Sequence, residues 1–404
     1  MPARSRLRER STKCFVTSDG AFATTDTGSD ARFKLRILSV IGTRPEAIKM
    51  AMVARALDAG EIEHRLCATG QHREMLDAVL AEFELHPDYD LGVMAPNQDL
   101  AHITQAVLTG MADVLNDFRP HRVLVQGDTT TTLAAALAAY YAKVPVGHVE
   151  AGLRSGDPTM PWPEEMNRRL TDQLSDRHYA PTPRDRENLL AEGIDDAGIL
   201  VAGNTGIDAL LHVAARLERE PALRQRARAA VGSMLDPARR LILVTAHRRE
   251  NIGSGLARIC EALGQLALRD DVEIVYPVHL NPKVAKPVRA ALGSRPHVHL
   301  PCPLEYVTFV YLMTRAHIII TDSGGIQEEA PALGIPVLVT REATERPQGL
   351  RARTARLVGT HVGRIVGEAH RLLNDRAAHA AMARRHSPYG DGCASERIRE
   401  DLAA

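Results

Sequence analysis

Apolar and polar residues follow one another in repeating blocks, each with a short apolar run, a turn and an amphipathic stretch. The first run is LRILSVI at residues 35–41, and Gly42 and Pro45 follow it, which is typical of a strand, a turn and a first helical turn. The unit recurs with strands expected at 64–69, 121–126 and 144–149, and helices beginning near His72, Thr130 and Pro163. Apolar strands that alternate with helices predict a parallel sheet covered on both faces.

The second half of the chain repeats this plan. Strands are expected at residues 241–246, 272–278, 317–321 and 336–340, with helical patterns between them. Turn residues around Gly203 to Asp208 precede a charged helical region, so we place a domain junction there. Two Rossmann-like halves direct the carboxyl ends of their strands toward ligands, which favours one ligand held by both domains.

Length and charge agree with this plan. The chain has 404 residues, which suits two domains. Lysine plus arginine equals aspartate plus glutamate, at 50 each, so the formal net charge is zero. No global field favours nucleic acid or a membrane surface, and any anion site is expected to be local.

Cysteine usage and the N-terminal composition indicate a cytoplasmic protein. The five cysteines are scattered and form no C-x-x-C pair, which argues against a disulfide framework or a zinc site. No apolar run reaches the roughly 18 residues of a membrane helix. Residues 1–33 are rich in Arg, Ser, Thr and Asp and contain no secretory signal. We interpret them as a disordered extension or a mis-assigned start, with a targeting role as the alternative.

The sharpest anion-binding pattern is TDSGGIQEEA, residues 321–330. A strand ends there, Ser323, Gly324 and Gly325 form a tight turn, and a helix begins. Free backbone N–H groups and the helix dipole suit a phosphate at such a place. Glu329, about one turn into the helix, is placed to accept from sugar hydroxyls. The alternative is a plain turn followed by acidic residues.

The motif GTRPEAIK, residues 42–49, takes the corresponding place in the first half. Pro45 suits a first helical turn, and Arg44 lies on the loop at the expected cleft. Lys49 is five residues further on and need not share its helix face. On pattern alone, an ordinary surface pair is the favoured interpretation.

Three carboxylates follow successive strands of the first half. Asp128 lies in QGDTTTT, Glu150 in HVEAGLRSGD and Glu164 in PWPEEMNRR. Taken singly, they are explained as a helix cap, a structural ion pair and a first-turn acid. Three acids at neighbouring strand ends or the loops that follow are a better case for acid/base chemistry.

Histidines follow two strands of the second half. His247 begins the run HRRENIG, where it is able to donate to a phosphate, and a solvated basic turn is an equal alternative. His279 in YPVHLNP follows the next strand and is also explained as a turn residue. The sequence contains no G-x-G-x-x-G, P-loop, metal-ligand cluster or nucleophile elbow.

Taken together, these motifs resemble the non-hydrolysing bacterial UDP-N-acetylglucosamine 2-epimerases. The ordered series also includes TGQHREMLD, PVHLNP, TERPQG and SPYGDGCASERI, and it runs from about Lys34 to the C-terminus. The resemblance implies an α/β GT-B fold, two Rossmann-like domains with parallel sheets facing an interdomain cleft. The implied domains are residues 34–204, onto which 386–404 cross back, and a UDP-binding domain of 205–385, with 1–33 outside them.

The resemblance also implies an isomerase that converts UDP-GlcNAc reversibly to UDP-ManNAc. C2 loses its proton as UDP leaves C1, and UDP adds back to the resulting 2-acetamidoglucal. No cofactor or metal is required. A homodimer is implied, and the product serves cell-surface polysaccharide synthesis.

Residue roles carry over motif by motif. Asp128, Glu150 and Glu164 match the three catalytic carboxylates, without settling which takes the C2 proton, and His247 matches a functional histidine near the phosphates. The residues that match nucleotide contacts are Arg44, Lys49, Ser323, Gly324, Gly325 and Glu329. Those that match a second site, where some members bind UDP-GlcNAc as an allosteric activator, are Gln71, His72 and His279.

Other functions remain open on the sequence. A relative acting on a modified UDP-GlcNAc, such as a 3-acetamido uronic acid, would share the same phosphate and ribose contacts. A GT-B glycosyltransferase would need an acceptor groove, and a nucleotide-sugar-binding regulator would bind without turnover. Three nearby acids argue against the regulator, because the mere binding of an anion gains nothing from them.

Overall fold

The computed structural model describes residues 34–70, 73–95, 98–385 and 388–404. The expected extension, residues 1–33, and two residues of the expected second site, Gln71 and His72, lie outside the described residues.

The first half of the chain forms a parallel sheet. Its strands are β1 Arg36–Ile41, β2 Glu63–Ala68, β3 Tyr89–Asp90, β4 Arg122–Gln126, β5 Val146–Val149, β6 Arg177–Ala180 and β7 Ile199–Val201. They lie in the order β3-β2-β1-β4-β5-β6-β7, and every described pairing is parallel. This is the Rossmann strand order with one further strand.

The second half forms another parallel sheet with the same plan. Its strands are β8 Arg240–Thr245, β9 Val272–Val275, β10 Val298–His299, β11 Ala316–Thr321, β12 Val337–Val339 and β13 Ala355–Leu357. Their order is β10-β9-β8-β11-β12-β13, again with parallel pairings throughout the described strands.

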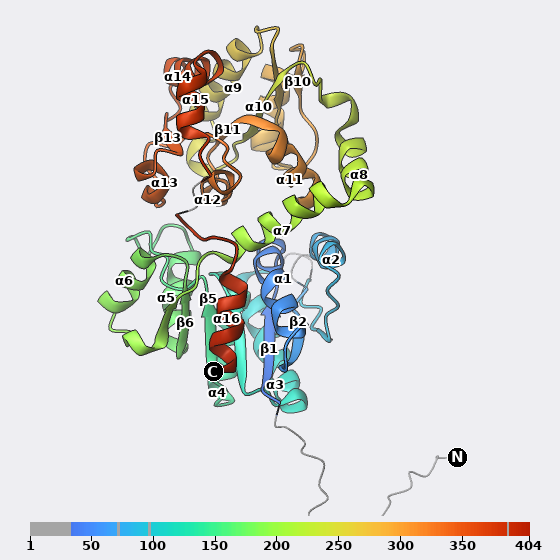
Figure 1. Ribbon diagram of the computed structural model, residues 1–404. Helices are drawn as coiled ribbons and strands as arrows, with labels where there is room; N and C mark the ends of the chain where they lie inside the picture. Colours follow the sequence, from blue (N-terminus) through green and yellow to red (C-terminus); the bar gives the residue numbers. More distant parts are fainter. Residues whose placement is uncertain (1–33, 71–72, 96–97, 386–387) are drawn as a thin grey trace, which may run out of the picture. The chain divides into compact units, whose positions relative to one another are not determined.

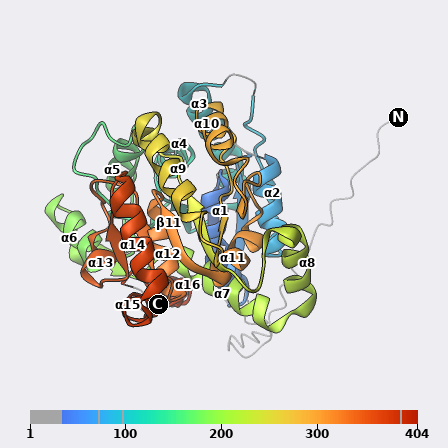
Figure 2. The ribbon, with the colours of Figure 1, turned by 90° about the horizontal axis from the view of Figure 1, so that it is seen from above.

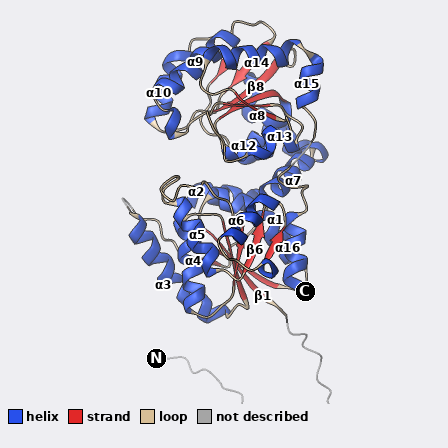
Figure 3. Cartoon of the chain, turned by 90° about the vertical axis from the view of Figure 1, so that its left-hand side faces the viewer, coloured by secondary structure: helices blue, strands red, loops and turns tan. Residues whose placement is uncertain are grey.

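Helices connect the strands and cover both faces of each sheet, as Figure 3 shows. In the first half they are α1 Arg44–Asp58, α2 Arg73–Glu82, α3 Leu100–Phe118, α4 Thr130–Tyr141, α5 Glu164–Leu174, α6 Pro183–Ala191 and α7 Thr205–Arg219. The later ones are α8 Pro221–Val231, α9 Ser254–Leu266, α10 Pro282–Leu292, α11 Tyr306–Arg315, α12 Gly324–Ala332, α13 Pro347–Arg351, α14 Val362–Asn374, α15 Arg376–Met382 and α16 Ala394–Ala403. Figure 2 shows α9 and α14 packed side by side over the second sheet.

Burial on both faces explains why the strands are almost wholly apolar. Ile37 and Ile41 of β1 point into one core together with α1 and α2, whereas Leu38 and Val40 point into another core with α3 and α4. Successive side chains of a strand alternate between faces, so a strand covered on both sides has no polar side to present. β8 follows the same rule.

The strand order reverses once in each sheet, between β1 and β4 and between β8 and β11. The connections on either side of a reversal lie on opposite faces of the sheet, which opens a crevice at the carboxyl ends of the two strands. Gly42 and Gly127 follow the strands at the first reversal, and His247 and Asp322 follow those at the second, within two residues of each strand end.

The structure confirms the expected strands and extends the list. The predicted strand 272–278 ends at Val275, although the backbone N–H groups of Tyr276 and Val278 still donate to the carbonyls of His299 and Pro301. The apolar pattern did not predict β3, β6, β7, β10 and β13, each of two to four residues.

Two helices connect parts of the chain that are far apart in sequence (Figure 1). α7 packs against α1 and also against α11 and α12, and Leu210 of α7 is fully buried in the core that they share. α16, the last helix, packs against α1 and buries Ile398. Within the described residues, no helix combines the length and the apolar character needed to cross a bilayer.

Truncation of Leu210 tests this shared core. Leu210→Ala removes a fully buried side chain and is expected to lower the free energy of unfolding by about 2–5 kcal/mol. The control is Leu268→Ala at a side chain that is 72% exposed, and its expected effect is within about 0.5 kcal/mol. Urea midpoints measure both, and equal midpoints for the two variants would contradict the assignment.

Candidate active site

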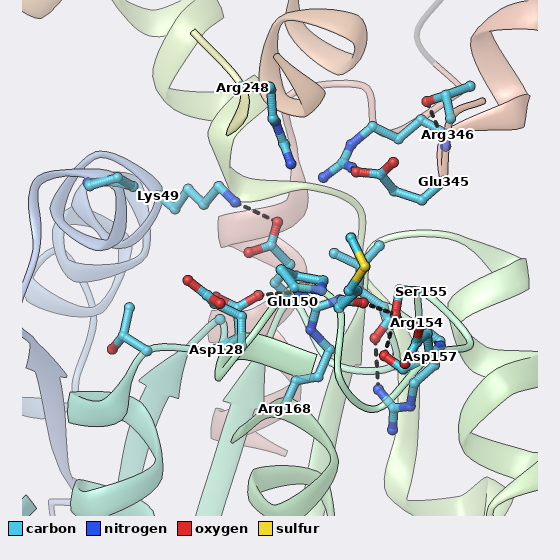
Figure 4. A pocket seen from close by; sticks show the side chains of 18 of the residues that line it. Lys49, Asp128, Glu150, Arg154, Ser155, Asp157, Arg168, Arg248, Glu345 and Arg346 are labelled. Atoms are coloured by element: carbon cyan, nitrogen blue, oxygen red, sulfur yellow. Dashed lines mark hydrogen bonds and ion pairs between the residues drawn. The ribbon is translucent and has the colours of Figure 1, made fainter. Parts of the chain in front are cut away.

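A cavity of about 700 Å³ opens where the carboxyl ends of the first sheet meet loops of the second (Figure 4). Three loops after β1, β4 and β5 and the start of α5 supply one wall, which carries Lys49, Asp128, Glu150 and Glu164. Loops after β8 and β12 supply the other. Its size lies within the range of small-molecule sites.

Glu150 and Lys49 form an ion pair on the first wall. Lys49 Nζ lies 2.5 Å from Glu150 Oε1, and Gln126 Nε2 donates to the other carboxylate oxygen. Burial raises the pKa of Glu150, but Lys49, followed by Arg346 and Arg168, outweighs it and holds the pKa below its ordinary value. Burial lowers the pKa of Lys49, and Glu150 with other acids raises it above the ordinary value. Both groups are therefore ionised at neutral pH.

The other two acids differ in how fully they are bonded. Arg168 donates to the carboxylate of Asp128, and Asn167 Nδ2 donates to its backbone carbonyl over 2.9 Å. Glu164 is the first residue of α5, and its Oε2 is buried without a hydrogen-bond partner among the described residues. A buried acceptor without a partner is rare in native proteins, and it is free for a ligand.

The opposite wall is basic. Arg248, Arg341 and Arg346 line it, and Arg346 pairs with Glu328 and with Glu345, whose Oε1 lies 2.5 Å from Arg346 Nη1. The Arg346 guanidinium also lies against the N-terminus of α12, because a β-carbon at Gly324 would be 2.5 Å from its Cζ. A guanidinium and a helix N-terminus both attract anions, so this wall suits phosphate.

Other predicted residues lie near the cavity without lining it in the described structure. The N-terminus of α12 lies against Arg346 and consists of Ser323, Gly324 and Gly325. Arg44 Nη2 donates to the backbone carbonyl of Leu304 over 3.0 Å.

Glu329, also outside the lining residues, has an unusual ionisation. Burial and then the charge of Glu328 raise the pKa of the Glu329 carboxyl to about 8, although Lys49 opposes the shift. At neutral pH this carboxyl is therefore mostly protonated, and it is able both to donate and to accept a hydrogen bond.

His247 and His279, predicted for different roles, are in ring contact. Their centroids are 5.2 Å apart and their planes 10° apart. The loop of His247 is held by the buried Asp322, which accepts from the backbone N–H of His247 over 3.0 Å and of Arg248 over 2.9 Å. Asn281 N donates to His279 Nδ1 over 3.1 Å, so the proton of the neutral ring is on Nε2. A ligand at His279 would therefore lie next to His247.

The first helix N-terminus has no room for a phosphate. The buried carboxylate of Glu46 accepts from the backbone N–H of Gly42 over 2.5 Å and of Thr43 over 2.8 Å. It also accepts from the hydroxyl of Thr129, across the reversal between β1 and β4. A protein carboxylate thus fills the place where a Rossmann domain binds a dinucleotide pyrophosphate. Among the described residues, no cluster of three His, Cys, Asp or Glu side chains is arranged to hold a metal ion.

Two residues of the site, Arg168 in PWPEEMNRR and Arg346 in TERPQG, have no role assigned from the sequence. Arg168 follows Glu164 by four residues, a spacing that places both on one helix face, and this was an available signal. No comparable signal marked Arg346 in TERPQG or Gln126 in QGDTTTT, because Glu328 and Glu150, to which they donate, lie 18 and 24 residues away in sequence.

Comparisons with known proteins agree with this geometry. A family model described as UDP-N-acetylglucosamine 2-epimerase matches residues 55–403. The UDP-N-acetylglucosamine 2-epimerase of Escherichia coli K12 is 53% identical over 370 residues, which cover 91% of this chain and 98% of the relative.

Solved structures give the same result. The crystal structure of UDP-GlcNAc 2-epimerase from Neisseria meningitidis bound to UDP-GlcNAc has a TM-score of 0.86 at 48% identity, covering 91% of this chain and 100% of that one. The Methanocaldococcus jannaschii UDP-GlcNAc 2-epimerase in complex with UDP-GlcNAc and UDP has a TM-score of 0.77 at 33% identity, covering 91% and 99%. The expected α/β GT-B fold is confirmed, and the chain belongs to the UDP-N-acetylglucosamine 2-epimerase family.

Proposed function

We propose that this chain interconverts UDP-GlcNAc and UDP-ManNAc by inverting C2 of the sugar. The observation that carries the proposal is a cavity with three carboxylates on one wall and arginines on the other. A nucleotide sugar matches this division, because its diphosphate needs cationic partners and its reacting carbon needs acid and base groups. The names of the relatives support the same substrate.

The reaction proceeds by elimination and re-addition. A base removes the C2 proton, the C–H electrons form a C1–C2 double bond, and the C1–oxygen bond breaks so that UDP leaves with its electron pair. The intermediate is 2-acetamidoglucal. In the return step C2 accepts a proton on its opposite face, and a phosphate oxygen of UDP bonds to C1. Atoms and electrons balance without an external oxidant or reductant.

Glu164 is the acid best suited to move the C2 proton. One of its oxygens has no described partner, whereas Glu150 is bonded to Lys49 and Gln126, and Asp128 is bonded to Arg168. A base must reach its proton directly, and a carboxylate that is paired with a cation is a weak base. Glu150 and Asp128 instead set the charge and orientation of the groups around the sugar.

The leaving group is stabilised by the basic wall. Arg346 and the N-terminus of α12, which Ser323, Gly324 and Gly325 form, offer positive charge to the departing diphosphate. His247 is the donor expected nearest to the phosphates, with Arg44 a further contact. Glu329 is assigned to the ribose, where a protonated carboxyl both donates to one hydroxyl and accepts from the other.

Activation by a second UDP-GlcNAc is proposed to act through His279. Its ring stacks on His247, so a ligand that binds His279 changes the surroundings of a residue assigned to the phosphates. Such coupling requires tighter binding of the activator to the active arrangement. The homodimer and the role in polysaccharide synthesis stay predictions from the family resemblance, and the cytoplasmic location stays a prediction from the composition.

Isotope exchange tests the proposed function. In D2O, the chain incubated with UDP-GlcNAc is expected to form UDP-ManNAc with deuterium at C2, because the proton removed exchanges with solvent before C2 is reprotonated. NMR follows both sugars, and the reaction is expected to need no added NAD. Formation of no epimer by the wild-type chain, or of epimer that keeps its original C2 hydrogen, would refute the proposal.

Substitution of Glu164 tests the assignment of the base. Glu164→Gln keeps the side-chain shape but cannot accept the C2 proton, so kcat is expected to fall about 100-fold or more. UDP affinity by calorimetry should change less than about 2-fold, because the lost group acts on the sugar. Glu261→Gln, at an exposed glutamate of α9, is the control with unchanged kcat. Parallel losses of kcat and UDP affinity in Glu164→Gln would contradict this role.

The raised pKa of Glu329 predicts a pH-dependent stability. In the unfolded chain a glutamate ionises near pH ~4.3, whereas Glu329 in the folded chain has a pKa of about 8. Between these values the folded state binds the extra proton, so its stability falls as pH rises through this window. Glu329→Gln cannot ionise, and its urea midpoint is expected to fall less than that of the wild type between pH 5 and 8. Identical pH dependence in the two proteins would refute the shift, and Glu261→Gln serves as the control.

A further inference from the structure

Helix α5 is inverted with respect to the usual amphipathic pattern. Its buried residues are all polar: Glu165, Asn167, Arg168, Thr171 and Asp172. Met166 and Leu170 on the same helix are 42% and 44% exposed. Burying polar groups in place of apolar ones gives up hydrophobic stabilisation and requires every buried group to find a partner. The polar face of α5 is therefore built for something other than stability.

The centre of this face is an ion pair between Asp172 and His148 of β5. Neither side chain is exposed to solvent, and His148 Nδ1 lies 2.6 Å from Asp172 Oδ1. The other ring nitrogen, Nε2, lies 2.8 Å from the backbone carbonyl of Gly127. A carbonyl only accepts, so Nε2 must carry a proton.

Asp172 is ionised and also acts as an acceptor. Burial raises its pKa, but His148 and then Arg154 outweigh burial and lower the pKa from its ordinary value. Asp172 thus places one carboxylate oxygen against Nδ1 of His148, and the His148 ring is held at both of its nitrogens.

The second carboxylate oxygen of Asp172 holds the loop that follows Glu150. Asp172 Oδ2 accepts from Arg154 Nη2 over 2.7 Å and from the backbone N–H of Gly152 over 3.3 Å. The same Arg154 nitrogen lies 2.6 Å from Glu192 Oε2, which fixes its position further.

One ion pair thus connects the three segments that carry the proposed acids. Gly127, whose carbonyl it binds, directly precedes Asp128, and Glu150 follows His148 by two residues. Glu164 lies on α5, the helix of Asp172. Asp128 and Glu150 thus lie within two residues of this buried network, and Glu164 shares a helix with one of its members.

One of these segments has a backbone conformation that needs support. Glu150 has φ of 68°, in the left-handed region that is unfavourable for a residue other than glycine, and Gly127 has φ of 75°. Such conformations persist where the surroundings hold them, and they gather at functional sites. The bonds of His148 to Gly127 and of Asp172 to Gly152 supply support on either side of the cavity wall.

We propose that His148 and Asp172 are positioning residues, which hold Asp128, Glu150 and Glu164 in a productive arrangement without touching the substrate. This inference rests on the proposed epimerase function. A displacement of about 1 Å in an acid or base is enough to lower the rate ~100-fold. Loss of the pair should therefore lower kcat and leave UDP binding, which the opposite wall provides, nearly unchanged.

His148→Gln tests the inference, and His178→Gln is its matched control. His178 is buried, pairs in register with His148 on the neighbouring strand, and places Nε2 2.8 Å from the backbone carbonyl of Asp172. The described hydrogen bonds of His178 do not reach the carboxylate of Asp172 or Gly127. Both variants remove a buried imidazole from the same sheet and should be destabilised similarly.

We expect kcat for C2 epimerisation to fall ~10- to 100-fold in His148→Gln and less than ~3-fold in His178→Gln. UDP affinity by calorimetry should stay within ~2-fold of the wild type in both. Equal losses in both variants, or an unchanged kcat in His148→Gln, would refute the positioning role. Inactivity of the wild type toward UDP-GlcNAc would instead refute the proposed function, so the two failures are distinguishable.

A further variant decides the matter if His148→Gln does not fold. Asp172→Asn keeps the volume and removes the charge, and we expect it to lower kcat at least ~10-fold with UDP affinity unchanged. Full kcat in Asp172→Asn would overturn the inference.

Discussion

The reversal of strand order within each parallel sheet is the constraint on which the rest of the structure depends. Consecutive parallel strands are connected by helical crossovers. Because the first strand of each half lies in the middle of its sheet, the crossovers to its two sides lie on opposite faces of the sheet. The loops after β1 and β4, and those after β8 and β11, are therefore left without a covering helix at the carboxyl ends. The candidate site is built from these loops and their neighbours.

Backbone groups at such reversals require partners, and the chain meets the need differently in its two halves. Glu46 fills the N-terminus of α1, and Asp322 accepts the N–H groups of the loop after β8. The N-terminus of α12 has no such internal carboxylate in the described structure and instead lies against Arg346. The Arg346 guanidinium is paired with Glu328 and Glu345, and together with the helix N-terminus it supports the proposed position of the diphosphate at this end of the cavity.

Division of charge between the two walls lets one ligand satisfy both. Acids on the first wall would repel a diphosphate, but Glu150 is partly neutralised by Lys49 and Asp128 by Arg168, and both cations come from the same half. Arg341 and Arg346 of the second wall are likewise paired with glutamates. The inverted helix α5 shows the cost of this arrangement, because its buried face holds charged groups where apolar ones would be more stabilising.

The apolar runs alone determined that the chain forms two α/β halves with parallel sheets, because a strand that is buried on both faces is apolar at nearly every position. They also placed Asp128, Glu150 and Ser323 at strand ends. Short strands such as β3 and β10 left no such pattern, since two residues carry no periodicity. The side of α5 that faces inward was decided by tertiary structure, because ion pairs between distant residues such as His148 and Asp172 outweigh the preference of Met166 and Leu170 for burial. The contacts of Lys49 with Glu150, of Arg346 with Gly324 and of His247 with His279 were decided in the same way. Each joins segments whose separation along the chain contains no information about their distance in space.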